Sequence, residues 1–234
     1  MSAESVAGAE APETKGVNEF GTLGTIFLNP RGTFAAMMEK PKYLLAIILV
    51  VVGMSAMTIP VFQSGVVLDE TIAKMEAKGA PQNQIEATEK IFNSPVGIAM
   101  GVGGAVVGVP FSLLFSAALL FFMGNFMFGA KLRYPHYLSA ACYGSVVGLI
   151  DHVVRTLLVI SKQTMDVRLG LGNLFGDELP YVGRVLDSLT DPLLLWAMAV
   201  TALGVAVYAK KGFGFGVLVS LPSLLITILL SGMR

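Results

Sequence analysis

Charge is the first thing that this sequence lacks. Only 14% of its residues are charged, whereas a soluble globular domain usually carries about 25%. Hydrophobic residues make up 54% of the chain, and its mean hydropathy is +0.72. We therefore expect most of the chain to lie in lipid. The formal net charge of zero argues against the basic surface that nucleic-acid binding requires, so no nucleic-acid partner is expected.

Cysteine and histidine are also scarce. The single cysteine, Cys142, excludes an intramolecular disulfide, and the two histidines, His136 and His152, cannot form a metal site alone. Ser145 and His152 lie about 10 Å apart along one predicted helix, which is too far for a base to activate a nucleophile. The sequence also has no phosphate-binding loop and no zinc-binding spacing. We expect no catalytic residue, no metal and no cofactor, and hence a protein that is not an enzyme.

The uncharged parts of the sequence form long apolar segments. Five of them can cross the ~30 Å hydrocarbon core of a bilayer as helices. The predicted spans are residues 43–62, 95–128, 137–161, 192–209 and 213–233, within a membrane domain of residues 43–234. Ser94-Pro95 and Asp191-Pro192 are typical of an N-cap and first helical residue, so they should begin the second and fourth spans. The sequence thus predicts an all-α integral membrane protein, a five-span helical bundle.

The loops between these spans predict its orientation. The two short loops contain Lys131 and Arg133, then Lys210 and Lys211, and no acidic residue, whereas the two long loops are more acidic than basic. Short loops rich in Lys and Arg stay in the cytoplasm. We therefore expect a multi-pass protein of the cell inner (cytoplasmic) membrane, with the N-terminus in the cytoplasm and the C-terminus outside.

The region before the first span has two parts. Residues 1–16 are small, polar and acidic, and are predicted to form a disordered tail. Residues 17–42 are predicted to form two short amphipathic helices on the cytosolic side, which either lie in the membrane interface or pack on the bundle. The residues that carry this pattern are Phe20, Phe27, Asn29, Pro30 and Phe34, with Asn29 as cap and Pro30 as first residue of the second helix.

One polar cluster lies inside the third predicted span, at Asp151, His152 and Arg155. The spacing of Asp151 and Arg155 lets the carboxylate reach the guanidinium within one helix. A charge inside a membrane is costly and marks a functional site by default, but a pair that neutralises itself is commonly a structural clamp. The clamp is the preferred interpretation. An ion or proton path and a docking site for a partner are the alternatives.

Glycines form a stripe on each of two spans. Small residues in a stripe let membrane helices approach closely, so we expect the second and third spans to pack against each other, or against a second copy, through these faces. Plain packing is favoured over a functional role. The helix-packing glycines are Gly97, Gly101, Gly104 and Gly108 on the second span, and Gly144 and Gly148 on the third.

The segment Ile26-Phe27-Leu28-Asn29-Pro30, followed by Phe34 and by Lys40-Pro41 just before the first span, resembles the start of bacterial members of the Yip (Ypt-interacting protein) membrane family. Five spans with a cytosolic N-terminus are similar to that family as well. The Asp-Leu-Tyr-Gly-Pro signature of eukaryotic members is absent, so the resemblance does not extend to a small-GTPase partner. It implies a non-enzymatic membrane protein. Eukaryotic members act in vesicle traffic and membrane shaping, and some bacterial relatives accompany ABC-type export systems.

Two functional hypotheses follow from these observations. The leading one is a scaffold or accessory subunit that contacts the lipid bilayer and binds other integral membrane proteins, an ABC transporter among them, or a second copy of itself. The alternative is a small transporter or channel whose polar path is the cluster of Asp151, His152 and Arg155.

Overall fold

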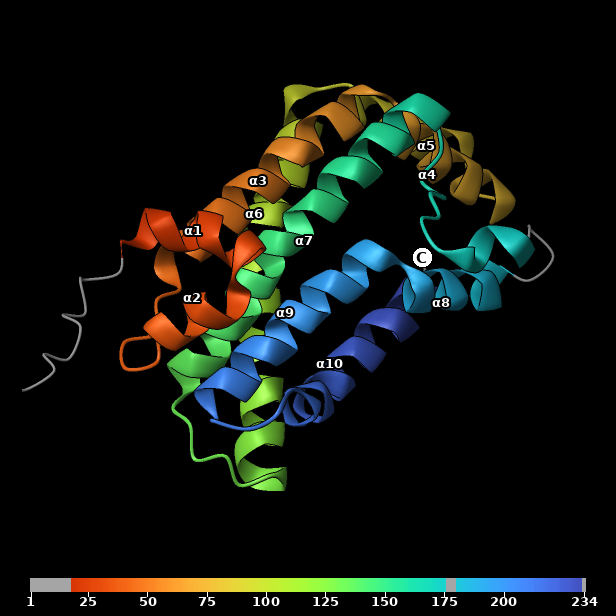
Figure 1. Ribbon diagram of the computed structural model, residues 1–234. Coiled ribbons are helices and arrows are strands. Elements are labelled where there is room, and N and C mark those ends of the chain that lie inside the picture. The colour runs from red at the N-terminus through yellow and green to blue at the C-terminus, as the bar shows by residue number, and fades with distance from the viewer. Residues whose placement is uncertain (1–17, 176–179, 233–234) are drawn as a thin grey trace, which may run out of the picture.

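A computed structural model describes residues 18–175 and 180–232, and every regular element in these two ranges is helical (Figure 1). The predicted disordered tail lies outside the described residues. The α-helices are α1 (Glu19–Leu28), α2 (Pro30–Ala36), α3 (Leu44–Gln63), α4 (Val66–Ala77), α5 (Gln82–Phe92), α6 (Pro95–Phe121), α7 (Tyr134–Lys162), α8 (Pro180–Thr190), α9 (Pro192–Tyr208) and α10 (Phe213–Gly232). A π-helical turn, η1 (Phe122–Met127), extends α6, and a 3-10 turn, η2 (Leu171–Phe175), precedes α8. The prediction of an all-α membrane protein is confirmed.

The five predicted spans coincide with α3, α6, α7, α9 and α10. Lipid cannot bond to a free backbone N–H or C=O, so such apolar segments must be helical to satisfy their own backbone. By length and composition alone, α3, α6 with η1, and α7 can each cross a membrane. The pair α8 and α9, bent by 55°, counts as a fourth crossing if it is one span. Within α10, the apolar stretch Phe213–Leu229 is shorter than these spans. Five crossings stay a prediction.

Three helices, α2, α6 and α9, begin at the predicted prolines Pro30, Pro95 and Pro192, and in two of them the preceding side chain makes the capping hydrogen bond. The Asn29 side chain accepts a hydrogen bond from the Gly32 N–H at 2.9 Å and so caps α2. Asp191 caps α9 in the same way. Ser94 stands at the cap position of α6, but its hydroxyl donates to the Ile91 carbonyl at 2.7 Å, because α5 ends directly before it and offers an acceptor.

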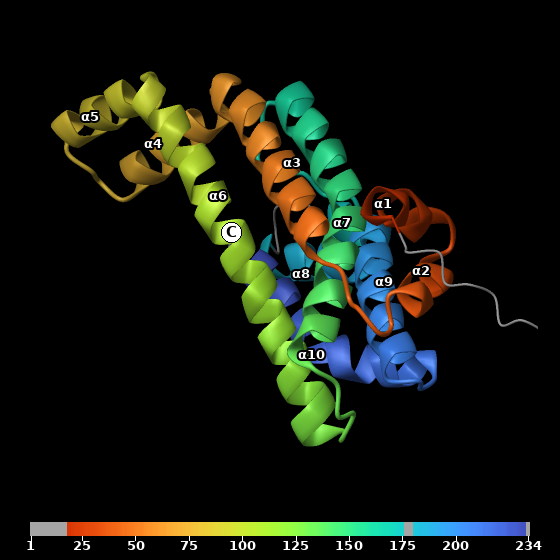
Figure 2. The same ribbon diagram turned by 90° about the vertical axis from the view of Figure 1, so that its left-hand side faces the viewer.

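The central helix of the bundle is α7, which packs against α3, α6 and α9, while α10 packs against α9. The core is densest at the first half of α7, where Tyr137 and Tyr143 are fully buried. Figure 2 shows α6 crossing one side of the bundle and carrying α4 and α5 at its far end. The outer position of α6 leaves much of its surface without a partner in the described chain.

The N-terminal helices pack directly on the bundle with their inner faces. Phe34 is completely buried, with its ring edge-on to Tyr143 and Tyr208. The hydroxyls of Thr22 and Tyr143 hydrogen-bond at 2.6 Å. The outer faces remain apolar and open, since Phe20 and Leu28 are 73% and 90% exposed. The inner faces of α1 and α2 therefore pack on the bundle, which was one of the two predicted alternatives. For their outer faces, contact with the membrane interface stays a prediction.

Candidate functional site: a charged junction between α7 and α9

The predicted ion pair within α7 forms as the spacing requires. The Arg155 Nε–H donates to both carboxylate oxygens of Asp151, at 2.9 and 3.0 Å. The two residues lie one turn apart, so this bond needs no help from another helix. Both side chains are largely buried, with 29% of Arg155 and 15% of Asp151 exposed.

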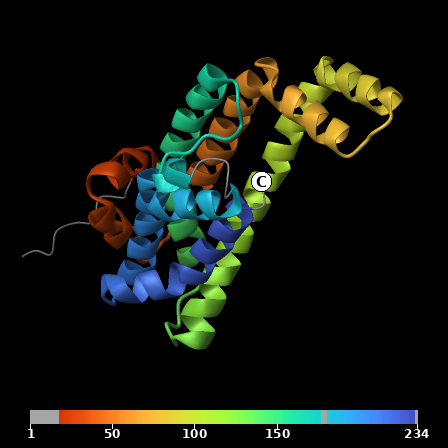
Figure 3. The same ribbon diagram turned by 90° about the vertical axis from the view of Figure 1, so that its right-hand side faces the viewer.

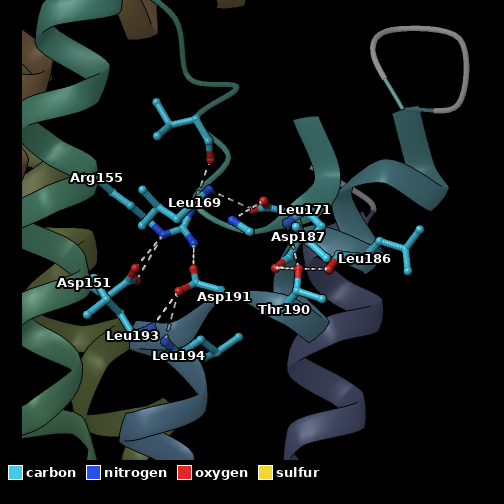
Figure 4. A network of polar contacts seen from close by, with 12 residues as sticks. Asp151, Arg155, Leu169, Leu171, Leu186, Asp187, Thr190, Asp191, Leu193 and Leu194 are labelled. Carbon is cyan, nitrogen blue, oxygen red and sulfur yellow. Dashed lines mark hydrogen bonds and ion pairs between the residues drawn. The ribbon is translucent and has the colours of Figure 1, made fainter. Parts of the chain in front are cut away.

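A third charged residue, Asp191, completes the junction from the start of α9. Arg155 Nη2 donates to Asp191 Oδ2 (Figure 4), and the Asp191 side chain is fully buried. Its other oxygen, Oδ1, accepts from the Leu193 and Leu194 N–H groups at 2.9 and 3.2 Å. Asp191 is thus both the cap of α9 and a counter-ion of Arg155. Sequence reasoning identified only the cap, although an acid directly before the next span was the available signal.

The same guanidinium also holds the segment that follows α7. Arg155 Nη1 donates to the Val167 carbonyl at 3.0 Å. A few residues later, Asp187 of α8 accepts from the N–H groups of Leu169 and Gly170, at 3.3 and 2.6 Å. The Thr190 hydroxyl accepts from the Leu171 N–H at 2.8 Å (Figure 4). Residues 167–171 of the connection after α7 are therefore held by three side chains, those of Arg155, Asp187 and Thr190.

These bonds define what the junction can do chemically. All three nitrogens of the Arg155 guanidinium are engaged, by Asp151, Val167 and Asp191. His152 is exposed on α7 and is not one of these acceptors. Among the described residues, no group of three or more His, Cys, Asp or Glu side chains is placed to hold a metal ion. The arrangement is that of an ion-pair clamp joining two helices and a connecting segment.

In the ranges that the structure describes, the glycine faces of α6 and α7 pack against different helices and not against each other. An added Cβ at Gly144 would meet Thr201 Oγ1 and the Ala197 carbonyl, so this glycine packs on α9. On α6, an added Cβ at Gly101 would lie 2.7 Å from the Phe62 ring of α3. The expected contact between the two faces is not found in the described chain, because α7 turns its glycines toward α9. Of the remaining glycines, Gly97 faces the last residues of α5 and Gly148 faces α9, while Gly104 and Gly108 have nothing within 4 Å of an added Cβ.

Comparison with known proteins gives one finding. The family model described as the Yip1 domain matches residues 24–233. This chain belongs to the Yip1 domain family. The resemblance inferred from the N-terminal segment is confirmed. Neither the curated proteins nor the solved structures gave a match to this Yip1-family chain.

The Yip1 match covers most of the features described above. It begins within α1, at residue 24, and includes α2, all five predicted spans and the charged junction. The family is associated with membrane trafficking and is not known as enzymatic. This Yip1-family chain is accordingly a multi-pass helical membrane protein in contact with the lipid bilayer.

Proposed function

We propose that this Yip1-family chain is a non-enzymatic scaffold or accessory subunit that binds other integral membrane proteins in the cytoplasmic membrane. The observation that carries the proposal is the placement of charge. Helices α3, α6, α9 and α10 contain no Asp, Glu, Lys, Arg or His. The charged pair in the middle of α7 is engaged in the junction. These charges therefore serve to join helices.

The alternative function, a small transporter or channel, needs a continuous polar lining. The buried polar side chains of the central helices mostly bond locally or to each other. The Thr201 hydroxyl donates to the Ala197 carbonyl of its own helix at 3.1 Å, and those of Ser139 and Tyr208 pair at 2.9 Å. For Arg155 to serve as part of a path, it would have to leave two carboxylates and a carbonyl. The geometry therefore favours the scaffold.

Helix α6 is the surface that suits a membrane partner. Gly104 and Gly108 lie one turn apart with nothing within 4 Å of an added Cβ. Phe111 and Phe115 continue the same face and are exposed. Because lipid offers no hydrophobic drive between spans, close backbone approach at small residues is what brings them together. The partner would be another integral membrane protein, an ABC-type exporter included, or a second copy.

The test is cross-linked affinity capture from native membranes. The double variant Gly104→Leu, Gly108→Leu places bulk on the open face and should lose the captured membrane partner. Gly103→Leu is the matched control, because Gly103 is equally open but lies about 100° around the helix. Capture that is the same for all three forms would contradict binding through this face.

A flux assay separates the scaffold from the transporter. We expect the purified chain in liposomes to give no proton or small-ion flux above that of empty liposomes. A flux that disappears in Arg155→Met would overturn the scaffold and support the Asp151, His152 and Arg155 path.

A further inference from the structure

An open cleft of about 490 Å³ lies between α4, the segment after α7, and α8. Its volume is within the range of roughly 300–1,000 Å³ found for small-molecule sites. Four basic side chains line it, from four parts of the chain: Lys74 from α4, Arg155 from α7, Arg168 from the segment after α7, and Arg184 from α8. Arg155 is already engaged in the junction. Val67, Met165 and Val167 supply an apolar part of the wall. The cleft is therefore amphipathic.

The carboxylates in this cleft are already used by the chain. Glu70 accepts from the Met165 N–H at 2.8 Å and pairs with Lys74 at 3.7 Å. Asp166 pairs with Arg168 at 2.7 Å, and Asp187 accepts from two backbone N–H groups, as described above. Arg184, in contrast, makes no hydrogen bond or ion pair with any described residue. As far as the described residues go, the cleft thus holds one guanidinium whose donors are free for a ligand.

If α9 and α10 cross the membrane as predicted, α8 and this guanidinium lie at its surface. Helix α8 lies across the ends of α9 and α10 (Figures 1 and 3) and meets α9 at a bend of 55°. Tyr181, Val182 and Leu189 are exposed apolar residues of α8. A short amphipathic helix of this kind lies in the interface between headgroups and acyl chains. Arg184 would then stand at the depth of lipid phosphates.

We infer that this cleft binds a phosphate-bearing group through Arg184, with Lys74 and Arg168 beside it. The anionic headgroup of a membrane phospholipid and free phosphate share this chemistry. A guanidinium presents parallel N–H donors that match two phosphate oxygens. The apolar wall at Val67, Met165 and Val167 suits the glycerol and first carbons of a lipid. This inference does not depend on the proposed scaffold function.

The experiment measures ligand-dependent thermal stability of the full chain in mild detergent. Dihexanoyl phosphatidylglycerol should raise the unfolding temperature, whereas dihexanoylglycerol, which lacks the phosphate, should not. Arg184→Gln should weaken the apparent affinity for phosphatidylglycerol about tenfold, equivalent to about 1.4 kcal/mol. Arg184→Lys should keep part of this affinity, because lysine retains the positive charge but lacks the two parallel N–H donors of a guanidinium. Arg133→Gln removes the same charge at the other end of α7 and should leave the affinity unchanged.

The outcomes separate the two sources of phosphate. Stabilisation by phosphatidylglycerol but not by inorganic phosphate or glycerol 3-phosphate identifies a lipid headgroup. Equal stabilisation by all three identifies a site for free phosphate in the same cleft. The inference is overturned if no phosphate compound stabilises the chain, or if Arg184→Gln binds phosphatidylglycerol like the native chain. It is equally overturned if Arg133→Gln loses as much affinity as Arg184→Gln. It is also overturned if Arg184→Gln without ligand unfolds earlier than the native chain, because Arg184 would then have an internal role.

Discussion

Arg155 bonds at once to its own helix, to the segment that follows, and to the start of α9. Replacing it by methionine leaves Asp151 and Asp191 as buried carboxylates without their cation. Breaking a buried pair costs about 3–5 kcal/mol in soluble proteins, so Arg155→Met should lower the unfolding temperature in detergent strongly. Asp151→Asn should cost far less, because Asp191 still neutralises Arg155. Equal losses in the two variants would mean that the pair within α7 is the stabilising unit.

A double variant sharpens this prediction. Replacing Asp151 and Arg155 together by leucine removes both charges from the middle of α7 but leaves Asp191 buried. Asp191 keeps the Leu193 and Leu194 N–H groups as donors, so stability should recover in part and not completely. Complete recovery would show that Asp191 does not need Arg155.

The residues of the junction differ in how far the sequence could predict them. The Asp151–Arg155 pair follows from spacing on one helix, which is a local property. Asp191 could not be assigned as its partner, because that contact spans 36 positions and depends on how α9 lies against α7. That Arg184 has no partner among the described residues could not be predicted either. It depends on which acidic side chains already accept hydrogen bonds from backbone N–H groups.

Two glycines on neighbouring helices should respond to alanine in opposite directions. At Gly144 an added Cβ overlaps Thr201, and overpacking of this kind costs about 1–3 kcal/mol. At Gly104 nothing lies within 4 Å, and alanine is better than glycine inside a helix by about 0.5–1 kcal/mol. Thermal unfolding in detergent should therefore show a loss for Gly144→Ala and a small gain for Gly104→Ala. A loss at Gly104 would mean that α6 is packed against a partner in the purified protein.

At the scale of elements, helix positions could be predicted and helix neighbours could not. Apolar length and the Asp191-Pro192 start place α9 within a residue of the expected span. The stripe of Gly144 and Gly148 predicts close approach, but it does not say which helix approaches. That choice depends on complementary shape, here the Thr201 and Ala197 surface of α9.

The orientation of the whole molecule is tested by cysteine labelling of intact cells. Lys78→Cys lies in the turn between α4 and α5, and Gly212→Cys lies between α9 and α10. A membrane-impermeant maleimide should label the first directly and the second only after permeabilisation. The native Cys142 is buried and supplies the unlabelled background control. Labelling of both from one side would mean that α8 and α9 form a re-entrant loop and do not cross.

The junction also bears on how the chain is inserted during synthesis. Asp191 emerges from the ribosome 36 residues after Arg155, which at about 5–20 residues per second is a delay of roughly 2–7 s. During that time α7 carries Arg155 toward the translocon with Asp151 as its only counter-ion. The ion pair within α7 therefore neutralises Arg155 during insertion, and the ion pair with Asp191 forms only after α9 has been synthesised.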